Sequence, residues 1–186
     1  MKFKPSLFFV GVFSLIIYLV YFILMKDLFN EDYLLFSTEG DEYNYFSASK
    51  FNRFSDEFSL IGLSSLNSLT GYTFYFDFIM KYGGNKLYQF IQLILFILSD
   101  LIFFKISSQI LNKKNALIAT IYFSILPLRH LWANSFYKEN EVIFLLLSVI
   151  YFSTYRISHF KYYVSLIILF LIRPFLSIIL FITISK

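Results

Sequence analysis

The first apolar run of the chain, from Pro5 to Met25, sets the strongest limit on its fold. The run holds no charged residue and follows Lys2 and Lys4. A stretch of about 20 apolar residues is long enough to cross a hydrocarbon core of about 30 Å. A signal peptide also has a basic start, but no small-residue cleavage site follows, and the run ends abruptly at Lys26. A membrane-spanning helix is the preferred interpretation, with a signal peptide as the alternative.

Four further apolar segments extend this pattern along the chain. Hydrophobic residues make up 58% of the 186 residues and charged residues only 15%, which is more apolar surface than one soluble domain could bury. The sequence therefore predicts an all-α polytopic membrane protein, forming one membrane domain over residues 1–186. About five spans are expected, near residues 5–25, 87–104, 115–133, 142–157 and 162–185.

Charge and cysteine content narrow the function classes. The formal net charge is +4 and the sequence pI is about 9.1. The basic residues are nevertheless scattered between the apolar segments and form no stripe that would follow a nucleic-acid backbone. The chain has no cysteine, so it has neither a disulfide framework nor a thiolate metal site. These features predict the bilayer as the environment and no nucleic-acid partner.

The charges between the apolar segments predict one orientation in the membrane. With a cytoplasmic N-terminus, the inner flanks carry basic residues and no carboxylate, as the positive-inside rule requires. These basic residues are Lys2, Lys4, Lys105, Lys113, Lys114, Arg156 and Lys161. All twelve acidic residues except Asp100 then fall outside. Heavy use of Phe, Ile, Tyr, Lys and Asn is typical of AT-rich bacterial genes, so the predicted location is the bacterial cytoplasmic membrane with the acidic loops outside.

The outer loop over residues 26–86 has helical patterns of its own. Apolar side chains recur there at spacings of three and four, at Phe51, Phe54, Phe58 and Ile61. Such a stripe predicts an amphipathic helix in the interface plane. The stretch from Tyr72 to Tyr82 is apolar but short and holds Asp77, which favours a second interfacial or re-entrant helix. The glycine pair at Gly83 and Gly84 predicts a helix end before the second span.

A shorter outer loop, before the fourth segment, carries the sequence SFYKENE, in which Glu139 and Glu141 are two residues apart. On an extended or turning backbone, carboxylates at that spacing can converge on a hard cation such as Mg²⁺ or Mn²⁺. Acids at the start of a helix are equally expected, because they favour the positive end of its dipole. Both interpretations stay open, and metal dependence is not assigned.

Arg173 and Asp100 are two of the charged residues that fall within the apolar segments. Arg173 lies well inside the fifth segment and precedes Pro174, which removes a helix hydrogen bond and is expected to bend the helix. A guanidinium within a span is costly unless it faces a polar cavity or a partner. If Arg173 is structural, Asp100 in the second segment is its expected partner.

Several stretches, in a fixed order, resemble a known family. They are GDEYNYFSASK, YTFYFDFIMKYGGNKLYQFIQ, ISSQILNKKNALIA, ILPLRHLWANSFYKENE and LIRPF. Together they span nearly the whole chain, which resembles the N-terminal part of a GT-C-fold membrane glycosyltransferase. It is similar to protein mannosyltransferases, aminoarabinose transferases and lipopolysaccharide and polysaccharide glycosyltransferases. Enzymes of this family usually have more spans, so a longer chain or a separate polypeptide is expected to complete the fold.

The resemblance implies transfer of a sugar from a polyprenyl-phosphate carrier to an acceptor on the outer leaflet. The family's catalytic acid pair maps onto Asp41 and Glu42, where a carboxylate would take the proton of the acceptor hydroxyl. Some branches carry a Lys-acid pair in the second loop, which matches Lys138 and Glu139 and makes Glu139 a further catalytic candidate. Others carry two acids there and use a metal, which matches Glu139 and Glu141. A cation must neutralise the leaving phosphate, and the candidates are Arg173, Lys138 and Arg129.

Two other classes of function stay open. A small transporter or substrate-binding subunit would use Asp100 and Arg173 as a polar pathway through the membrane. A non-catalytic accessory protein would depend on no single polar residue, and the acids of the first loop would then be solvated or paired with nearby basic residues. His130 and Trp132 are expected in an interfacial aromatic belt and His159 in an inner loop, so none of them is a site candidate.

Overall fold

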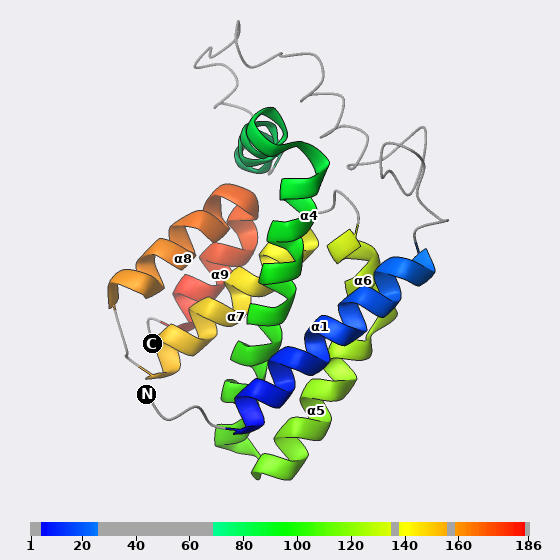
Figure 1. The fold of residues 1–186 in the computed structure, drawn as a ribbon. Coiled ribbons are helices and arrows are strands. Elements are labelled where there is room, and N and C mark those ends of the chain that lie inside the picture. The colour runs from blue at the N-terminus through cyan, green and yellow to red at the C-terminus, as the bar shows by residue number, and fades with distance from the viewer. Residues whose placement is uncertain (1–4, 26–68, 135–137, 156–158, 185–186) are drawn as a thin grey trace, which may run out of the picture.

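The computed structural model describes residues 5–25, 69–134, 138–155 and 159–184, and every regular element in these ranges is a helix (Figure 1). The helices are α1 (Pro5–Met25), α4 (Leu69–Ile110), α5 (Lys113–Ile125), α6 (Pro127–Asn134), α7 (Glu139–Tyr155), α8 (His159–Ile172) and α9 (Pro174–Ile184). The predicted all-α fold is thus confirmed for the described part of the chain. The expected stripe around Phe54 lies outside the described residues.

The long helix α4 runs through the middle of the bundle and divides it into two sides (Figure 1). On one side, α4 packs against α1, α5 and α6; on the other, it packs against α7 and α8, and α9 packs on α8. The first side has two small cores, one of them formed by Val10, Phe104 and Ala116. The second side has a larger core that includes Phe76, Tyr88, Val149 and Leu169.

Two helices are long and apolar enough to cross a membrane, over Ser6–Leu24 and Phe78–Ile110. A third span results if α5 and α6, which meet at a bend of 54°, are counted together. The remaining helices are shorter, with 17 residues in α7, 14 in α8 and 11 in α9. The described residues therefore support a membrane protein with two or three candidate spans, while the five spans stay a prediction.

The start of the second span differs from the expectation. Instead of a separate short helix followed by a span from residue 87, α4 begins at Leu69 and continues to Ile110 with a kink. The kink is at Gly84, whose φ of 59° and ψ of −164° lie outside helical geometry. This backbone region is accessible almost only to glycine. The predicted break at the glycine pair is therefore present, but the helix resumes directly, and the first arm of α4 turns sharply away from the long arm (Figure 1).

The segment expected as a fifth span is also divided. It forms α8 and α9, with Arg173 between them and Pro174 as the first residue of α9, a position that proline favours. The Ser177 hydroxyl donates to the Leu166 carbonyl at 3.0 Å. In a straight helix these residues, 11 positions apart, would be about 16 Å apart along the axis. α9 therefore folds back against α8, a larger change of direction than the predicted bend.

Candidate functional site

Two buried polar residues of α4, Gln92 and Asp100, each have 0% exposure. They are eight positions apart in the sequence, which corresponds to about 12 Å along the helix. Each is the centre of a polar cluster on one side of α4. We call Ser14, Asp100, Ser124 and Arg129 the Asp100 cluster, and Gln92, Lys138, Glu139, Asn140, Glu141 and Arg173 the Gln92 cluster.

The centre of the Asp100 cluster is a buried ion pair between Asp100 and Arg129. Arg129 Nη1 lies 2.6 Å from Asp100 Oδ1, and the two side chains are 3% and 0% exposed. The hydroxyls of Ser14 and Ser124 both donate to Asp100 Oδ2 at 2.6 Å. Three helices, α1, α5 and α6, thus each supply a donor to one carboxylate of α4. Because a buried charge is tolerated only when it is paired and hydrogen-bonded, this cluster has the character of a structural junction.

The break between α5 and α6 explains why Arg129 and His130 lie in this junction. A helix end leaves carbonyl groups without helical donors, and within a bilayer they must be satisfied by protein groups. Arg129 Nη1 donates to the Phe123 carbonyl at 3.1 Å, and His130 Nε2 lies 2.6 Å from the Ser124 carbonyl. The Tyr21 hydroxyl donates to the next carbonyl, that of Ile125, at 3.2 Å.

Aromatic rings complete the environment of the two basic side chains. The Arg129 guanidinium lies 3.8 Å from the ring centroid of Phe123 and 4.3 Å from that of Phe96. The His130 ring stacks on Tyr21 with 3.8 Å between the centroids. These contacts place both side chains in the protein interior, where His130 is 0% exposed. The expectation that His130 belongs to an interfacial aromatic belt is therefore wrong.

Two further expectations about these charges need correction. Arg129 was a candidate for phosphate binding, whereas its guanidinium is buried against Asp100. Asp100 was expected to be the partner of Arg173, whereas Arg173 pairs with Glu139. Asp100 and Arg173 thus belong to separate ion pairs on opposite sides of α4, and the polar pathway of the transporter interpretation gains no support from their contacts.

The Gln92 cluster is more open at one end. Arg173 Nη2 lies 2.6 Å from Glu139 Oε1, and the two side chains are 40% and 22% exposed. Deeper in the protein, the Gln92 amide donates to Glu141 Oε1. Asn140 Nδ2 donates to the Gln92 side-chain carbonyl at 2.6 Å and to its backbone carbonyl at 3.1 Å. A partly exposed ion pair therefore adjoins a buried network of amide and carboxylate groups, since Glu139 and Glu141 lie in the same helix turn.

The acids of this cluster occupy the first turn of α7, where they favour the positive end of the helix dipole. Their carboxylates have different partners, Arg173 for Glu139 and Gln92 for Glu141. No group of three or more His, Asp or Glu side chains that could hold a metal ion occurs within the described ranges. A divalent site that includes Glu139 and Glu141, one of the two interpretations left open, would thus need ligands from outside those ranges.

Two more side chains belong to the surroundings of Glu141. Lys138, just before α7, is 1% exposed. Burial raises the pKa of Tyr75, on the first arm of α4, and the Glu141 carboxylate raises it further. The Tyr75 phenol therefore stays protonated at neutral pH and keeps a hydrogen-bond donor near this carboxylate. Among the predicted site residues, Lys138, Glu139, Glu141 and Arg173 are thus placed in one region.

The other predicted catalytic residues, Asp41 and Glu42, lie outside the described residues. Sequence reasoning missed Gln92 and Asn140, although Gln92 is a polar residue within an apolar run and Asn140 lies between the two predicted acids. Comparisons with protein-family models, with curated proteins and with solved structures found no match to this chain. The chemistry of the Gln92 cluster is therefore inferred from its own side chains.

Proposed function

We propose that the chain is a membrane glycosyltransferase, or the N-terminal part of one. It would transfer a sugar from a polyprenyl-phosphate-linked donor to a glycan, lipid or protein acceptor at the cell surface. The observation that carries this proposal is the partly exposed pair of Arg173 and Glu139, which adjoins a buried polar network because Glu139 and Glu141 share the first turn of α7. Such a pair offers a cation and a carboxylate, the two groups that phosphate departure and hydroxyl activation require.

Arg173 is the proposed ligand of the donor phosphate. Its guanidinium is 40% exposed, so a lipid-linked phosphate can reach it without unfolding of the bundle. A guanidinium binds phosphate through two parallel hydrogen bonds, and a phosphate could replace Glu139 as its partner. Lys138, next to Glu139, is the second proposed source of positive charge, whereas Arg129 already neutralises Asp100.

Glu139, released from Arg173 by the phosphate, would join Asp41 and Glu42 as the carboxylates of the reaction. The segment that carries Asp41 and Glu42 connects the end of α1 to the start of α4, and both ends lie toward the end of the bundle where α7 begins (Figure 1). If Mg²⁺ or Mn²⁺ takes part, these acids are the oxygen ligands that would join Glu139 or Glu141.

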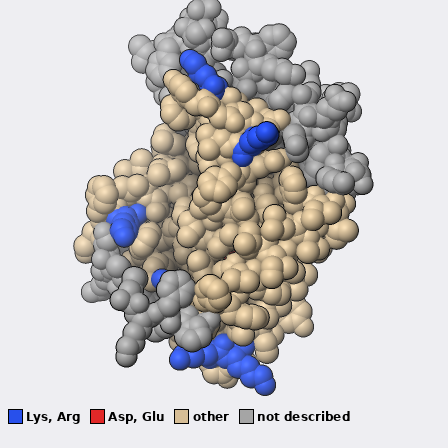
Figure 2. All heavy atoms as spheres, viewed as in Figure 1, with Lys and Arg blue, Asp and Glu red and all other residues tan. Residues whose placement is uncertain are grey.

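The proposal also includes the location. The chain would lie in the bacterial cytoplasmic membrane with its N-terminus in the cytoplasm, so that the Gln92 cluster opens at the outer leaflet. Basic side chains lie at the opposite end of the molecule, near the turn from α4 to α5, and other basic side chains lie elsewhere on this face (Figure 2). The support for the orientation is the sequence, in which the expected inner flanks carry basic residues and no carboxylate, as the positive-inside rule favours. A separate polypeptide that completes the fold is the proposed protein partner.

The test is sugar transfer in membrane vesicles that contain the full chain and a pool of polyprenyl-phosphate-linked sugars. Asp41→Asn and Glu42→Gln should each reduce transfer by about 10²- to 10⁴-fold if the residue is the general base. Glu39→Gln, in the same loop, is the matched control, because Glu39 is expected to be solvated. Equal activity of all three variants would contradict the proposed catalytic role.

Arg173→Lys tests the phosphate site separately. It keeps the positive charge and removes the bidentate geometry, so the apparent KM for the carrier lipid should rise while the protein stays folded. Lys114→Gln changes a basic residue at the opposite end of the bundle and should leave the KM unchanged. An unchanged KM in Arg173→Lys would move the phosphate site away from this residue.

A further inference from the structure

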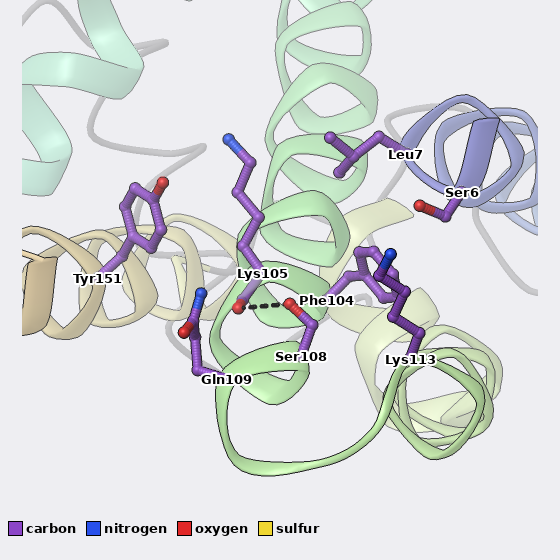
Figure 3. A pocket seen from close by; sticks show the side chains of 8 residues that line it. All are labelled: Ser6, Leu7, Phe104, Lys105, Ser108, Gln109, Lys113 and Tyr151. Carbon is purple, nitrogen blue, oxygen red and sulfur yellow. Dashed lines mark hydrogen bonds between the residues drawn. The ribbon is translucent and has the colours of Figure 1, made fainter. Parts of the chain in front are cut away.

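A second polar site lies at the other end of the bundle. A cavity of about 300 Å³ opens there between α1, α4, α5 and α7. Its polar lining residues are Ser6, Lys105, Ser108, Gln109 and Lys113, and its apolar ones are Leu7 and Phe104, with Tyr151 at the edge. Figure 3 shows Lys105 between the Tyr151 ring and the α1 residues, with the Lys113 side chain beside Phe104. The proposed glycosyltransferase chemistry uses none of these residues.

The charged side chains that line this cavity are all positive. Two lysines line it, and none of the eight lining residues is acidic. The helices α1 and α5 begin beside it, and neither has an acidic residue in its first turn. The positive ends of two helix dipoles therefore add to the two ammonium groups. The described lining residues therefore give the cavity a positive charge, which favours an anionic ligand.

The depth of the cavity indicates where that anion comes from. One candidate span begins at Ser6 and the other ends at Ile110, so the lining residues lie at the boundary between the apolar bundle and water. This is the level of lipid head groups. Exposed apolar side chains continue the surface beside it, with Ile110 81% exposed and Phe8 60% exposed. The lower limit for small-molecule pockets is about 300 Å³, so the cavity suits a head group rather than a whole lipid.

We propose that this cavity binds the phosphate of an anionic membrane phospholipid, with Lys105 and Lys113 as its charged ligands. The Ser6 hydroxyl and the Gln109 amide supply neutral donors, since the Ser108 hydroxyl already donates to the Lys105 carbonyl at 2.9 Å. Leu7 and Phe104 provide the apolar wall along which the first part of the lipid lies. The bound lipid would tie the start of α1 to the turn between α4 and α5.

The test uses the full chain in lipid nanodiscs of phosphatidylcholine with increasing amounts of phosphatidylglycerol. Phosphatidylglycerol retained by the protein is measured by native mass spectrometry, and the midpoint of thermal unfolding is measured in parallel. Lys105→Gln combined with Lys113→Gln should weaken phosphatidylglycerol binding by roughly 30-fold, the typical effect of two basic residues near an anionic membrane. Lys113→Gln alone, at the exposed first residue of α5, should weaken it by roughly fivefold and is the milder variant if the double variant does not fold.

The matched control is Lys81→Gln combined with Lys86→Gln. Both lysines are exposed, and Lys81 Nζ lies 5.8 Å from the Tyr82 ring centroid, much as Lys105 Nζ lies 5.5 Å from that of Tyr151. This variant removes the same charge and should retain wild-type lipid binding. Equal loss in both double variants would overturn the proposal in favour of general charge attraction. Inorganic phosphate that stabilises the protein as much as the lipid does would instead assign the cavity to a soluble anion.

Discussion

Two ion pairs among the described residues have the same separation of 2.6 Å between nitrogen and oxygen but differ in exposure. Asp100 and Arg129 are 0% and 3% exposed, whereas Glu139 and Arg173 are 22% and 40% exposed. They lie on opposite sides of α4. The distance between the two charges therefore does not distinguish the roles of the pairs. The surrounding groups determine whether a pair stays together in the folded protein or can exchange one partner for water or a ligand.

Other side chains of the described residues enclose the buried pair and keep it away from water. Asp100 accepts hydrogen bonds from Ser14, Ser124 and Arg129, and two aromatic rings cover the guanidinium. Opening this pair would leave two charges in an apolar medium. The exposed pair can open toward solvent, where water or a phosphate replaces the lost contact at small cost. This contrast is the physical reason for assigning chemistry to the second pair.

The largest expected effect on the free energy of unfolding is therefore at the buried pair of Asp100 and Arg129. Asp100→Ala should lower the free energy of unfolding by about 3–5 kcal/mol, because it leaves the Arg129 charge buried without its partner. Arg129→Met should cost a similar amount. The double variant Asp100→Leu with Arg129→Met should recover much of the loss, since an apolar pair of similar volume often replaces a buried ion pair without cost.

Unfolding can be followed in detergent micelles by the fluorescence of Trp132, the single tryptophan of the chain, which lies on α6 with Arg129. Ser99→Ala is the matched control, because Ser99 is the neighbour of Asp100 and its hydroxyl donates only within the helix, to the Leu95 carbonyl. A loss below about 1 kcal/mol for Asp100→Ala, comparable to a surface pair, would contradict the structural role of the junction.

Features that depend on a local signal could be predicted from the sequence. The uncharged run forms α1, the break at Pro174 is present, and the acids before the fourth segment occupy a helix start. Each follows from chain length, from proline geometry or from the helix dipole. The glycine pair also predicted a break near Gly84. It did not predict that the helix resumes after the break, so that the kink lies inside α4.

The partners of the buried charges could not be predicted in the same way. In a soluble protein, an apolar stripe shows which helix face is inside, but the spans of this chain are apolar on nearly every face. The periodicity of apolar residues therefore could not predict that the hydroxyls of Ser14 and Ser124 face Asp100. The pairing of Asp100 with Arg129 also depends on the break at Leu126, which places α6 at 54° to α5. The proline that begins α6 was the available signal.

A moderate loss of stability is expected for a substitution at Gly84. It should be confined to the side of α4 that packs against α7 and α8, where the exposed pair lies. Gly84→Ala places a Cβ in a backbone region that only glycine adopts readily, at a cost of about 1–3 kcal/mol. A Cβ there meets no atom within 4 Å, so the cost is conformational. The first arm of α4 carries Phe76, which belongs to the core shared with α7 and α8. Amide hydrogen exchange should therefore accelerate in that arm and in α7, and stay unchanged in α1 and α5.

Gly11→Ala is the control for this substitution. Gly11 lies inside α1 and its added Cβ also meets no atom within 4 Å, but its backbone is helical. The variant should therefore be more stable by roughly 0.5–1 kcal/mol. Faster exchange spread evenly over both sides of α4 in Gly84→Ala would show that the two sides do not respond independently.

The smallest effect on stability is expected at the exposed pair of Glu139 and Arg173. Glu139→Gln and Arg173→Gln should each change the free energy of unfolding by no more than about 1 kcal/mol, because solvent screens the charges and solvates whichever partner remains. A double-mutant cycle of the two substitutions should give a coupling energy in the same range, against several kcal/mol for the Asp100 and Arg129 cycle. Arg173→Gln should nevertheless weaken the binding of polyprenyl phosphate, measured with purified protein in nanodiscs. A coupling energy near that of the buried pair would mean that Glu139 holds Arg173 too tightly to exchange it for a phosphate, and the donor site would then have to be sought around Lys138.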